Sequence, residues 1–480
     1  MEYEPTIGLE THAQLLTASK MFCSCSADYS ATPANSSVCP VCLGMPGSLP
    51  VINHRAVEFA IMTGLALNCH IAEISRFARK NYNYPDLVKG YQISQWDLPI
   101  CYGGWLQVRT DGHTRRIGIH DVHLEEDTGK LVHVDGQSLI DFNRSGVPLL
   151  EIVTEPDFTS LQEVHEYVFQ LRRVLRYLGV SSGNMEEGAM RFEANISLHP
   201  AGTSEMGERV EIKNLNSFKA LWRALEHEIS RQEKVLREGG TIDRETRGWH
   251  ETRGITYVQR SKEFADDYRY FPEPDLPPLE IRPEWVERIR AGMPELPDQR
   301  RQRFMSEYQL SEYDASLLTE DRPVADYFER TLSEAKRRGM TPKPVANWIT
   351  GEVFRLLHDN NLEITAIKVA PAELAEVIAL VKDKVITMST GKHVLRIMFA
   401  TGRAARDIVA EEGLAQITGA DQLAPIVEQV ITTNTDAVAQ YKRGKHTVLR
   451  FLLGQVMKAT KGKADPKAAT EMLKQKLTGS

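Results

Sequence analysis

Hydrophobic and polar residues alternate along several segments in the first 290 positions, which is the pattern of strands with one buried side. In residues 7–15 one set of alternate positions is apolar, and the other set carries Glu10, His12 and Gln14. Similar segments recur at residues 117–125, 190–198 and 210–213, and Glu151 lies inside the apolar run 147–153. We therefore predict a sheet with one apolar face and one polar face.

Two segments of the same region follow the helical period instead. Residues 160–179 begin with a capping box, Ser160 to Glu163, and a second helix is predicted from Ser217 to Gly239. Both helices are expected to pack on the sheet. The proline-rich segment 271–278 is expected to form a loop or an extended strap, because proline lacks a backbone donor and restricts the residue before it.

From about Met293 onward the apolar residues recur with the helical period. The pattern predicts an α+β fold in which a domain with an antiparallel sheet, residues 1–293, precedes an all-α domain, residues 294–403. A small all-α, basic tail domain follows at residues 404–480. Within residues 441–480, ten Lys and Arg face only Asp465 and Glu471, a net charge of +8, whereas the whole chain carries −7. Such a tail suits contact with a polyanion, and a solvated basic helix pair is the alternative.

Composition excludes several classes of protein. With 42% hydrophobic and 26% charged residues, the 480-residue chain is neither disordered nor fibrous. No stretch approaches the roughly 18 apolar residues that a membrane-spanning helix needs, and the first residues lack the pattern of a secretory signal. We expect a soluble, cytoplasmic protein without membrane contact.

Four of the six cysteines lie close together in the sequence. Cys23 and Cys25 are followed by Cys39 and Cys42, a spacing that suits a tetrahedral zinc ion held by four thiolates. Because all four ligands would come from the protein, the zinc would be structural. Free thiols that merely lie near one another are the alternative, and six cysteines are too few for a disulfide scaffold.

The polar positions of the predicted strands share one chemistry. They are carboxylates and histidines with a few cations: Glu10, His12, Asp121, His123, Glu125, Glu151, Arg191, Glu193, Glu211 and Lys213. The polar side of a single strand is usually just solvated, but five such strands favour a hard cation such as magnesium, completed by phosphate oxygens. Candidate phosphate ligands are Arg79, Lys80, Lys89, Arg144, Arg191 and Lys213. The pattern indicates ATP-dependent phosphoryl transfer on a sheet.

The common nucleotide-binding and hydrolase motifs are missing from the sequence. It has no G-x-x-x-x-G-K-[ST] or G-x-G-x-x-G loop. Asp127, Thr128, Gly129 and Lys130 are a candidate phosphate loop or, equally, a plain turn. No G-x-S-x-G or S-x-x-K constellation is present, so we expect no amide hydrolysis by this chain.

Several strings of residues resemble the B subunit of the tRNA-dependent Asp/Glu amidotransferases. They lie along essentially the whole chain, at residues 8–12, 23–47, 79–95, 124–130, 141–146, 213–217, 267–275 and 454–466. The resemblance implies a cradle-shaped catalytic domain, a helical domain and a mobile tail domain that contacts tRNA.

The resemblance also implies the reaction. ATP would phosphorylate the side-chain carboxylate of Glu-tRNA(Gln) or Asp-tRNA(Asn), and ammonia would displace phosphate to give the amide. An amidase-type glutaminase (the A subunit) would supply the ammonia through a protected channel, and a small C subunit would complete a heterotrimer.

The resemblance implies roles for residues as well. The magnesium ligands would be His12, Glu125 and Glu151, with Glu10 adjacent. Catalytic roles fall to these four residues and to Arg191, Glu193 and Lys213. ATP contacts are expected from Lys80, Lys89, Asp127, Thr128, Gly129, Lys130 and Arg144. In one strand, Glu193 stands where the family usually has Asp, which makes that carboxylate one methylene longer.

Two other functions compete with this one. A ligase acting on a free carboxylate substrate would use the same metal-binding face without needing the basic tail. A non-enzymatic tRNA-binding or assembly protein would use that face only for its fold.

Overall fold

The structure is a computed structural model that describes residues 2–110, 112–203, 205–261, 268–416, 420–460 and 462–478. Asp267, part of one of the strings above, lies outside these residues. The chain divides into two compact units, Met1–Leu296 and Pro297–Ser480.

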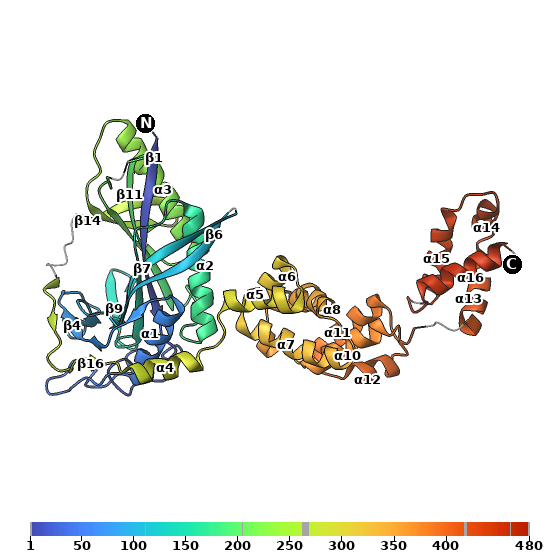
Figure 1. The fold of residues 1–480 in the computed structure, drawn as a ribbon, viewed down its shortest axis with the longest axis horizontal. Helices are drawn as coiled ribbons and strands as arrows, with labels where there is room; N and C mark the ends of the chain where they lie inside the picture. Colours follow the sequence, from blue (N-terminus) through green and yellow to red (C-terminus); the bar gives the residue numbers. More distant parts are fainter. Residues whose placement is uncertain are drawn as a thin grey trace. The chain divides into compact units, whose positions relative to one another are not determined.

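A twelve-stranded sheet is the framework of the first unit (Figure 1). The main path runs in the order β14 (Ile255–Ser261), β13 (Glu245–His250), β12 (Val210–Leu215), β11 (Met190–Pro200), β1 (Tyr3–Gln14), β10 (Pro148–Thr154), β7 (His113–Glu126), β5 (Gln92–Gln95), β4 (Phe77–Lys80) and β15 (Phe271–Pro272). Branching from β7 are β6 (Cys101–Thr110) and then β2 (His70–Ile71). Two small sheets pair β3 (Ile74–Ser75) with β16 (Leu279–Glu280), and β8 (Lys130–Val134) with β9 (Gln137–Asp141).

The sheet differs from the predicted antiparallel one in a single described pairing. β12 and β13 run parallel, whereas the other described pairs run antiparallel. The reason is the connection between them. Helix α3 (Phe218–Arg237) joins the two strands, and a crossover of this kind returns the chain in the same direction.

Helices cover the apolar side of this sheet. Predicted apolar positions of β1, among them Ile7, Leu9 and Ala13, are at most 1% exposed and belong to one core with residues of α1 (His54–Ala66) and α3. Helix α2 (Leu161–Leu178) packs on β6, and α3 packs on β11, as Figure 1 shows. Both predicted helices are confirmed. Burial of this apolar face leaves the opposite face for chemistry.

The caps of the two helices match the sequence with one difference. Ser160 caps α2 and Ser217 caps α3, and Gly179 ends α2 in the left-handed conformation. The carboxylate of Glu163, however, accepts from the backbone N–H of Thr159 at 2.8 Å rather than completing a capping box with Ser160. The predicted strap at residues 271–278 contributes only the short strand β15 and its turn, and the chain then enters β16 and α4 (Pro283–Gly292).

The second unit is helical in its described residues. Its elements are α5 (Pro297–Tyr308), α6 (Glu312–Leu318), α7 (Arg322–Arg337), α8 (Pro342–Asn347), the π-helix η2 (Trp348–Val353), α9 (Phe354–Asn360), the 3₁₀ turn η3 (Ile364–Ala366), α10 (Pro371–Lys382), α11 (Met388–Thr401), α12 (Ala405–Glu411), α13 (Ala420–Thr433), α14 (Thr435–Lys442), α15 (Val448–Ala459) and α16 (Pro466–Thr478). Two separate apolar cores lie within it: the first reaches Val409, and the second starts at Leu423. No helix among the described residues has the length and apolar character required to cross a bilayer.

Candidate active site

Three side chains from adjacent strands converge at the centre of the polar face. His12 lies on β1, Glu151 opposite it on β10, and Glu125 on the next strand, β7. The Nε2 atom of His12 is 3.5 Å from a carboxylate oxygen of Glu125 and 3.5 Å from one of Glu151. One ligand atom from each of the three lies within 4.8 Å of the others. Oxygen-rich donors at these separations fit a magnesium ion, which keeps open positions for phosphate and water.

A second histidine holds Glu151 in place. Nε2 of His123 lies 3.0 Å from Glu151, and its Nδ1 lies 2.6 Å from Asp121. Burial opposes charge on Glu151, but His12 and His123 outweigh it and lower the pKa of that carboxyl well below its ordinary value. Glu125 shows the reverse balance: burial and the Glu151 charge raise its pKa. Burial disfavours the imidazolium of His12, yet the carboxylates around it raise its pKa to about 9.

A second acidic group lies beside this centre, toward β11 and β12. Ligand atoms of Glu10, Glu193 and Glu211 also lie within 4.8 Å of one another. Nζ of Lys213 bridges two of them, at 2.8 Å from Glu193 and 3.2 Å from Glu211. The longer side chain of Glu193 thus reaches an ion pair with Lys213.

Glu10 has an unusual proton affinity because of these neighbours. Burial raises its pKa to about 7, and the charges of Glu151, Glu193 and Glu211 add to the shift, while a hydrogen bond from Asn195 opposes it. The Nδ2 atom of Asn195 donates to Glu10 at 2.9 Å. Burial together with like charges crowded at one site accounts for the direction of the shift.

Arg191 completes this side of the face through Asp127. Nη2 of Arg191 lies 3.0 Å from Asp127 Oδ1, and Nε2 of Gln14 donates to the other oxygen at 2.8 Å. Burial would raise the pKa of Asp127, but Arg191 and Arg144 lower it. The buried carboxylate therefore fixes Arg191 next to His12, its neighbour across β1 and β11.

The segment 127–130 links β7 to β8, and backbone amides within it are already bonded. The N–H of Thr128 donates to Asp127 Oδ1, and that of Gly129 donates to the carbonyl of Asp86. The side chain of Arg144 in turn donates to the carbonyls of Thr128 and Gly129. These two amides are engaged within the protein, and the phosphate loop and the plain turn both stay predictions; Lys130 itself is exposed at the start of β8.

The neighbouring cations Arg79 and Lys80 point to opposite sides of β4. Arg79, a candidate phosphate ligand, forms ion pairs with Glu273 at 2.7 Å and with Asp275 at 3.1 Å. Both carboxylates belong to the strap at residues 271–278. Lys80 lies on the active face. Burial would lower its pKa, yet Tyr270, Glu125 and Glu151 raise it well above the ordinary value.

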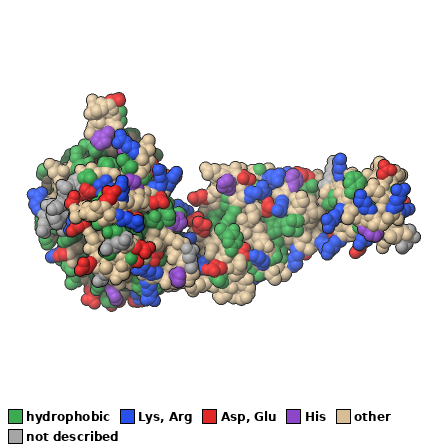
Figure 2. Space-filling model, turned by 90° about the horizontal axis from the view of Figure 1, so that it is seen from above, with side chains coloured by type: hydrophobic (Ala, Val, Ile, Leu, Met, Phe, Trp, Pro, Cys, Tyr) green, Lys and Arg blue, Asp and Glu red, His purple; other side chains and the backbone are tan. Residues whose placement is uncertain are grey.

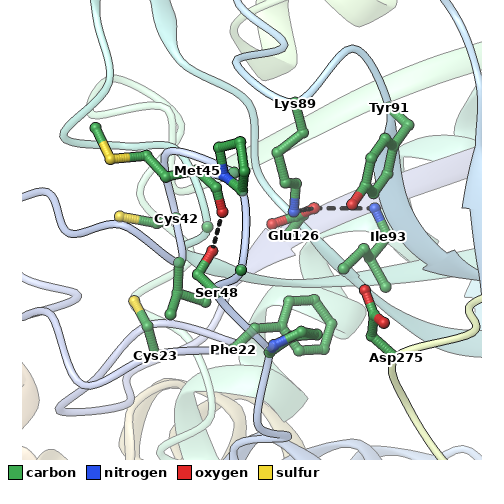
Figure 3. A pocket seen from close by; sticks show the side chains of 16 residues that line it. Phe22, Cys23, Cys42, Met45, Ser48, Lys89, Tyr91, Ile93, Glu126 and Asp275 are labelled. Carbon is green, nitrogen blue, oxygen red and sulfur yellow. Dashed lines mark hydrogen bonds and ion pairs between the residues drawn. The ribbon is translucent and has the colours of Figure 1, made fainter.

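Lys89 lies away from the centre, in a pocket beside the cysteines. It forms an ion pair with Glu126, whose carboxylate also accepts from the N–H of Ile93 at 2.9 Å (Figure 3). The pocket measures about 200 Å³ and is lined also by Phe22, Met45 and Asp275. Lys89, which was predicted to contact ATP, therefore lies in this pocket and not among the carboxylates of the centre.

The four clustered cysteines come together as predicted. The Sγ atoms of Cys23, Cys25, Cys39 and Cys42 all lie within 4.8 Å of one another. A tetrahedral zinc site requires sulfur atoms roughly 3.8 Å apart, given zinc–sulfur bonds of about 2.3 Å. The donor set thus fits zinc.

Positive charge next to the cysteines supports the same interpretation. The buried side chain of Lys20 places Nζ 3.8 Å from Cys42 Sγ and donates to the carbonyl of Ser37. A hydrogen bond from Cys23 lowers the pKa of Cys42 to about 5. The same hydrogen bond raises the pKa of Cys23, so these surroundings, Lys20 included, favour the thiolate form at Cys42. Zinc binds thiolates.

Several residues of the face were not among the predicted site residues. Asp121, His123 and Glu211 occupy alternate strand positions that the pattern had marked, so the same signal identifies them. Lys20 gave no signal in the sequence, because its role depends on the packing around it.

The chain matches known family models over both of its units. Residues 5–287 match the GatB/GatE catalytic domain, and residues 326–477 match the GatB domain. The first model covers the whole face described above.

Curated relatives align along the full length. The B subunit of the aspartyl/glutamyl-tRNA(Asn/Gln) amidotransferase of Roseiflexus castenholzii is 53% identical, and the alignment covers 99% of both chains. Proteins of the same name from Dehalococcoides mccartyi (53% identical, 99% of both chains) and Caldanaerobacter subterraneus (51%, 100% of both) are similar as well. The chain therefore belongs to the family of aspartyl/glutamyl-tRNA(Asn/Gln) amidotransferase B subunits, as its sequence motifs predicted.

Proposed function

We propose that this protein carries the ATP-dependent half of the amidotransferase reaction on the face of its sheet. The enzyme family is a ligase that consumes ATP and takes its amide nitrogen from glutamine. The observation that carries the proposal is the centre formed by His12, Glu125 and Glu151, with the partly buried cations Lys80 and Lys213 on either side of it.

The chemistry follows from the inertness of a carboxylate toward ammonia. One side-chain oxygen of the Glu or Asp on Glu-tRNA(Gln) or Asp-tRNA(Asn) attacks the γ-phosphorus of ATP, and ADP leaves. Ammonia then attacks the carbonyl carbon of the acyl phosphate. Inorganic phosphate leaves, the nitrogen loses a proton, and the amide remains. Positioning and charge neutralisation supply most of the rate in such a reaction.

The protein groups divide this work by position. Magnesium held by His12, Glu125 and Glu151 would supply positive charge at the transferred phosphoryl group. Lys213 and Arg191 lie toward β12 and β11, where they would neutralise phosphate oxygens, with Glu10 and Glu193 setting their positions. Lys80, on the opposite side of the centre, would face the substrate carboxylate. ATP contacts by Asp127, Thr128, Gly129, Lys130, Arg144 and Lys89 stay predictions.

The remaining parts have proposed roles outside the chemistry. Zinc at the four cysteines would be structural. Three separate cores support the division into domains at residues 1–293, 294–403 and 404–480. The basic tail would bind the mischarged tRNA, and we propose that the enzyme acts in the cytoplasm. Since the relatives are one component of a larger enzyme, we infer an amidase-type glutaminase A subunit and a small C subunit as partners.

ADP release by the complete complex tests the proposal. We expect release in magnesium to depend on Glu-tRNA(Gln) or Asp-tRNA(Asn), to be absent with correctly charged tRNA, and to fall at least about 100-fold in Glu125→Gln. Glu155→Gln, a partly exposed carboxylate just beyond β10, is the control. Turnover that ignores tRNA would instead indicate a ligase for a free substrate. No turnover in a metal-loaded complex would leave only a binding role.

A further inference from the structure

Two aromatic rings form a flat, partly exposed surface at the edge of the sheet. Trp96 and Tyr270 stack with ring centroids 4.4 Å apart and planes 7° apart. The Trp96 side of the stack is open, since 51% of this residue is exposed. A large exposed indole held parallel to another ring is a ready surface for a third planar group.

The strand register places these rings on the active face. Ser94 of β5 lies across from Glu125 on one side and from Ala78 on the other, so Lys80, two residues beyond Ala78, shares that face. Trp96 follows the end of β5 and joins this region through its stack on Tyr270. Phe271 pairs with Arg79, which puts the preceding Tyr270 level with Lys80.

Electrostatics agree with this placement. Burial raises the pKa of Tyr270 to about 12, and the charges that act on it are those of Lys80, Glu151 and Glu125. Tyr270 therefore lies within electrostatic reach of Glu125 and Glu151. Further rings continue the surface, since Nζ of Lys80 is 4.9 Å from the ring centroid of Tyr268, which packs edge-on against Tyr82.

The two sides of the centre suit different substrates. Toward β11 and β12, Glu10, Glu193 and Lys213 offer carboxylates and cations, which fit a triphosphate with its divalent ion. Toward β4 and β15, one lysine and stacked rings fit a carboxylate joined to a planar base through a linker without phosphate. The aminoacylated 3′-terminal adenosine of a tRNA has this composition, because only the ribose ester separates its base from the amino acid.

We propose that Trp96 and Tyr270 form a stacking platform for the 3′-terminal adenine of the charged tRNA, with Lys80 facing the amino-acid carboxylate. The inference rests on the proposed function and adds the groups that position the substrate. Neither ring takes part in bond making. Their effect is to hold the reacting carboxylate at the centre, and stacking of this kind is sequence-tolerant, which fits an invariant terminal base.

Kinetics of the complete complex test the platform. We expect Trp96→Ala and Tyr270→Leu to lower kcat/KM for Glu-tRNA(Gln), followed by ADP release, about 10-fold or more, while KM for ATP changes less than about 2-fold. Trp96→Phe, which keeps a ring, should retain most of the activity. Phe271→Leu is the matched control, since its half-exposed ring lies on the opposite face of β15.

A small substrate separates stacking from misfolding. The wild-type complex should release ADP faster with 3′-O-glutamyl-adenosine than with glutamic acid α-methyl ester, and Trp96→Ala should reduce this preference at unchanged methyl-ester activity. The platform would be overturned if Trp96→Ala kept the full preference for 3′-O-glutamyl-adenosine. It would also be overturned if the variant raised the KM for ATP and left kcat/KM for the charged tRNA unchanged. Those results would leave the proposed function standing if wild-type ADP release with tRNA still required the mischarged form, whereas equal release with mischarged and correctly charged tRNA would sink the proposed function itself.

Discussion

Individual carboxylates in this protein differ in proton affinity according to what lies across from them. Glu151 faces two histidines and stays ionised, whereas Glu10 faces other acids and has a pKa of about 7. Both lie on neighbouring strands of one face, so residue type alone says little about charge. The difference between the two pKa values comes from the neighbouring side chains, which are set by the strand register.

Glu329 of α7 gives this principle a measurable consequence for stability. Burial would raise its pKa, but hydrogen bonds from Arg303, Tyr308 and Arg300 lower it to about 2, from an ordinary value of 4.5. Nη1 of Arg303 and the hydroxyl of Tyr308 each donate to Oε1 at 2.7 Å. The unfolded chain binds this proton more readily, so the stabilisation is complete above about pH 4.5 and is lost as the pH falls toward 2.

We therefore predict that Glu329→Gln flattens the acid limb of the stability curve. The free energy of unfolding in urea, measured for both proteins at about pH 7 and pH 3, should fall less between the two values in the variant. Glu334→Gln, a more exposed carboxylate of the same helix, should behave like the wild type. An identical acid dependence in Glu329→Gln would contradict the assigned role of this ion pair.

Among the elements, the connection between β1 and α1 depends most on a cross-link. Residues 15–53 contain no helix or extended strand, and loops of this length rarely hold one conformation without support. The four cysteines and Lys20 gather there. We predict about one tightly bound zinc per chain by elemental analysis.

Removing the cross-link should cost much of the stability of the first unit. Cys39→Ser with Cys42→Ser should abolish the bound zinc and lower the unfolding free energy by on the order of 4 kcal/mol or more. Cys69→Ser, outside the cluster, should keep its zinc. Full stability in a metal-free double variant would show that the thiols alone hold the loop.

Strand length explains which strands could be predicted from the sequence and which could not. In β1 and β11 alternation over many residues places apolar side chains from Ile7 to Ala13 and from Met190 to Ile196 in the core. Short strands such as β4 and β15 have too few residues for a period, so the sequence did not separate Lys80 on the active face from Arg79 on the other. Their faces follow from pairing between segments about 190 residues apart, as in Arg79 with Phe271.

On the scale of the whole molecule, charge is divided between an acidic body and a basic end. Residues 441–480 carry a net +8, although the chain as a whole carries −7. Figure 2 shows Lys and Arg side chains spread over the visible face of the C-terminal helices. The described cations there are mostly exposed, including Lys442, Arg443 and Lys445 around the turn after α14. They are therefore available to phosphates.

Changing Lys442, Arg443 and Lys445 to Glu should weaken tRNA binding and its dependence on salt, because each lost phosphate contact reduces the slope of log K against log salt by about 0.7 to 0.9. The KM for ATP should stay the same, since the metal centre lies in the first unit. Glu at the exposed Arg330, Arg337 and Arg396 changes the net charge equally and serves as the control. If both triple variants lose tRNA affinity equally, only the net charge of the protein matters and not the position of the tail cations. If the tail variant keeps its tRNA affinity, the tail does not bind tRNA. If only the tail variant loses affinity, the C-terminal helices bind the body of the tRNA. The sheet then binds only the aminoacylated 3′ end.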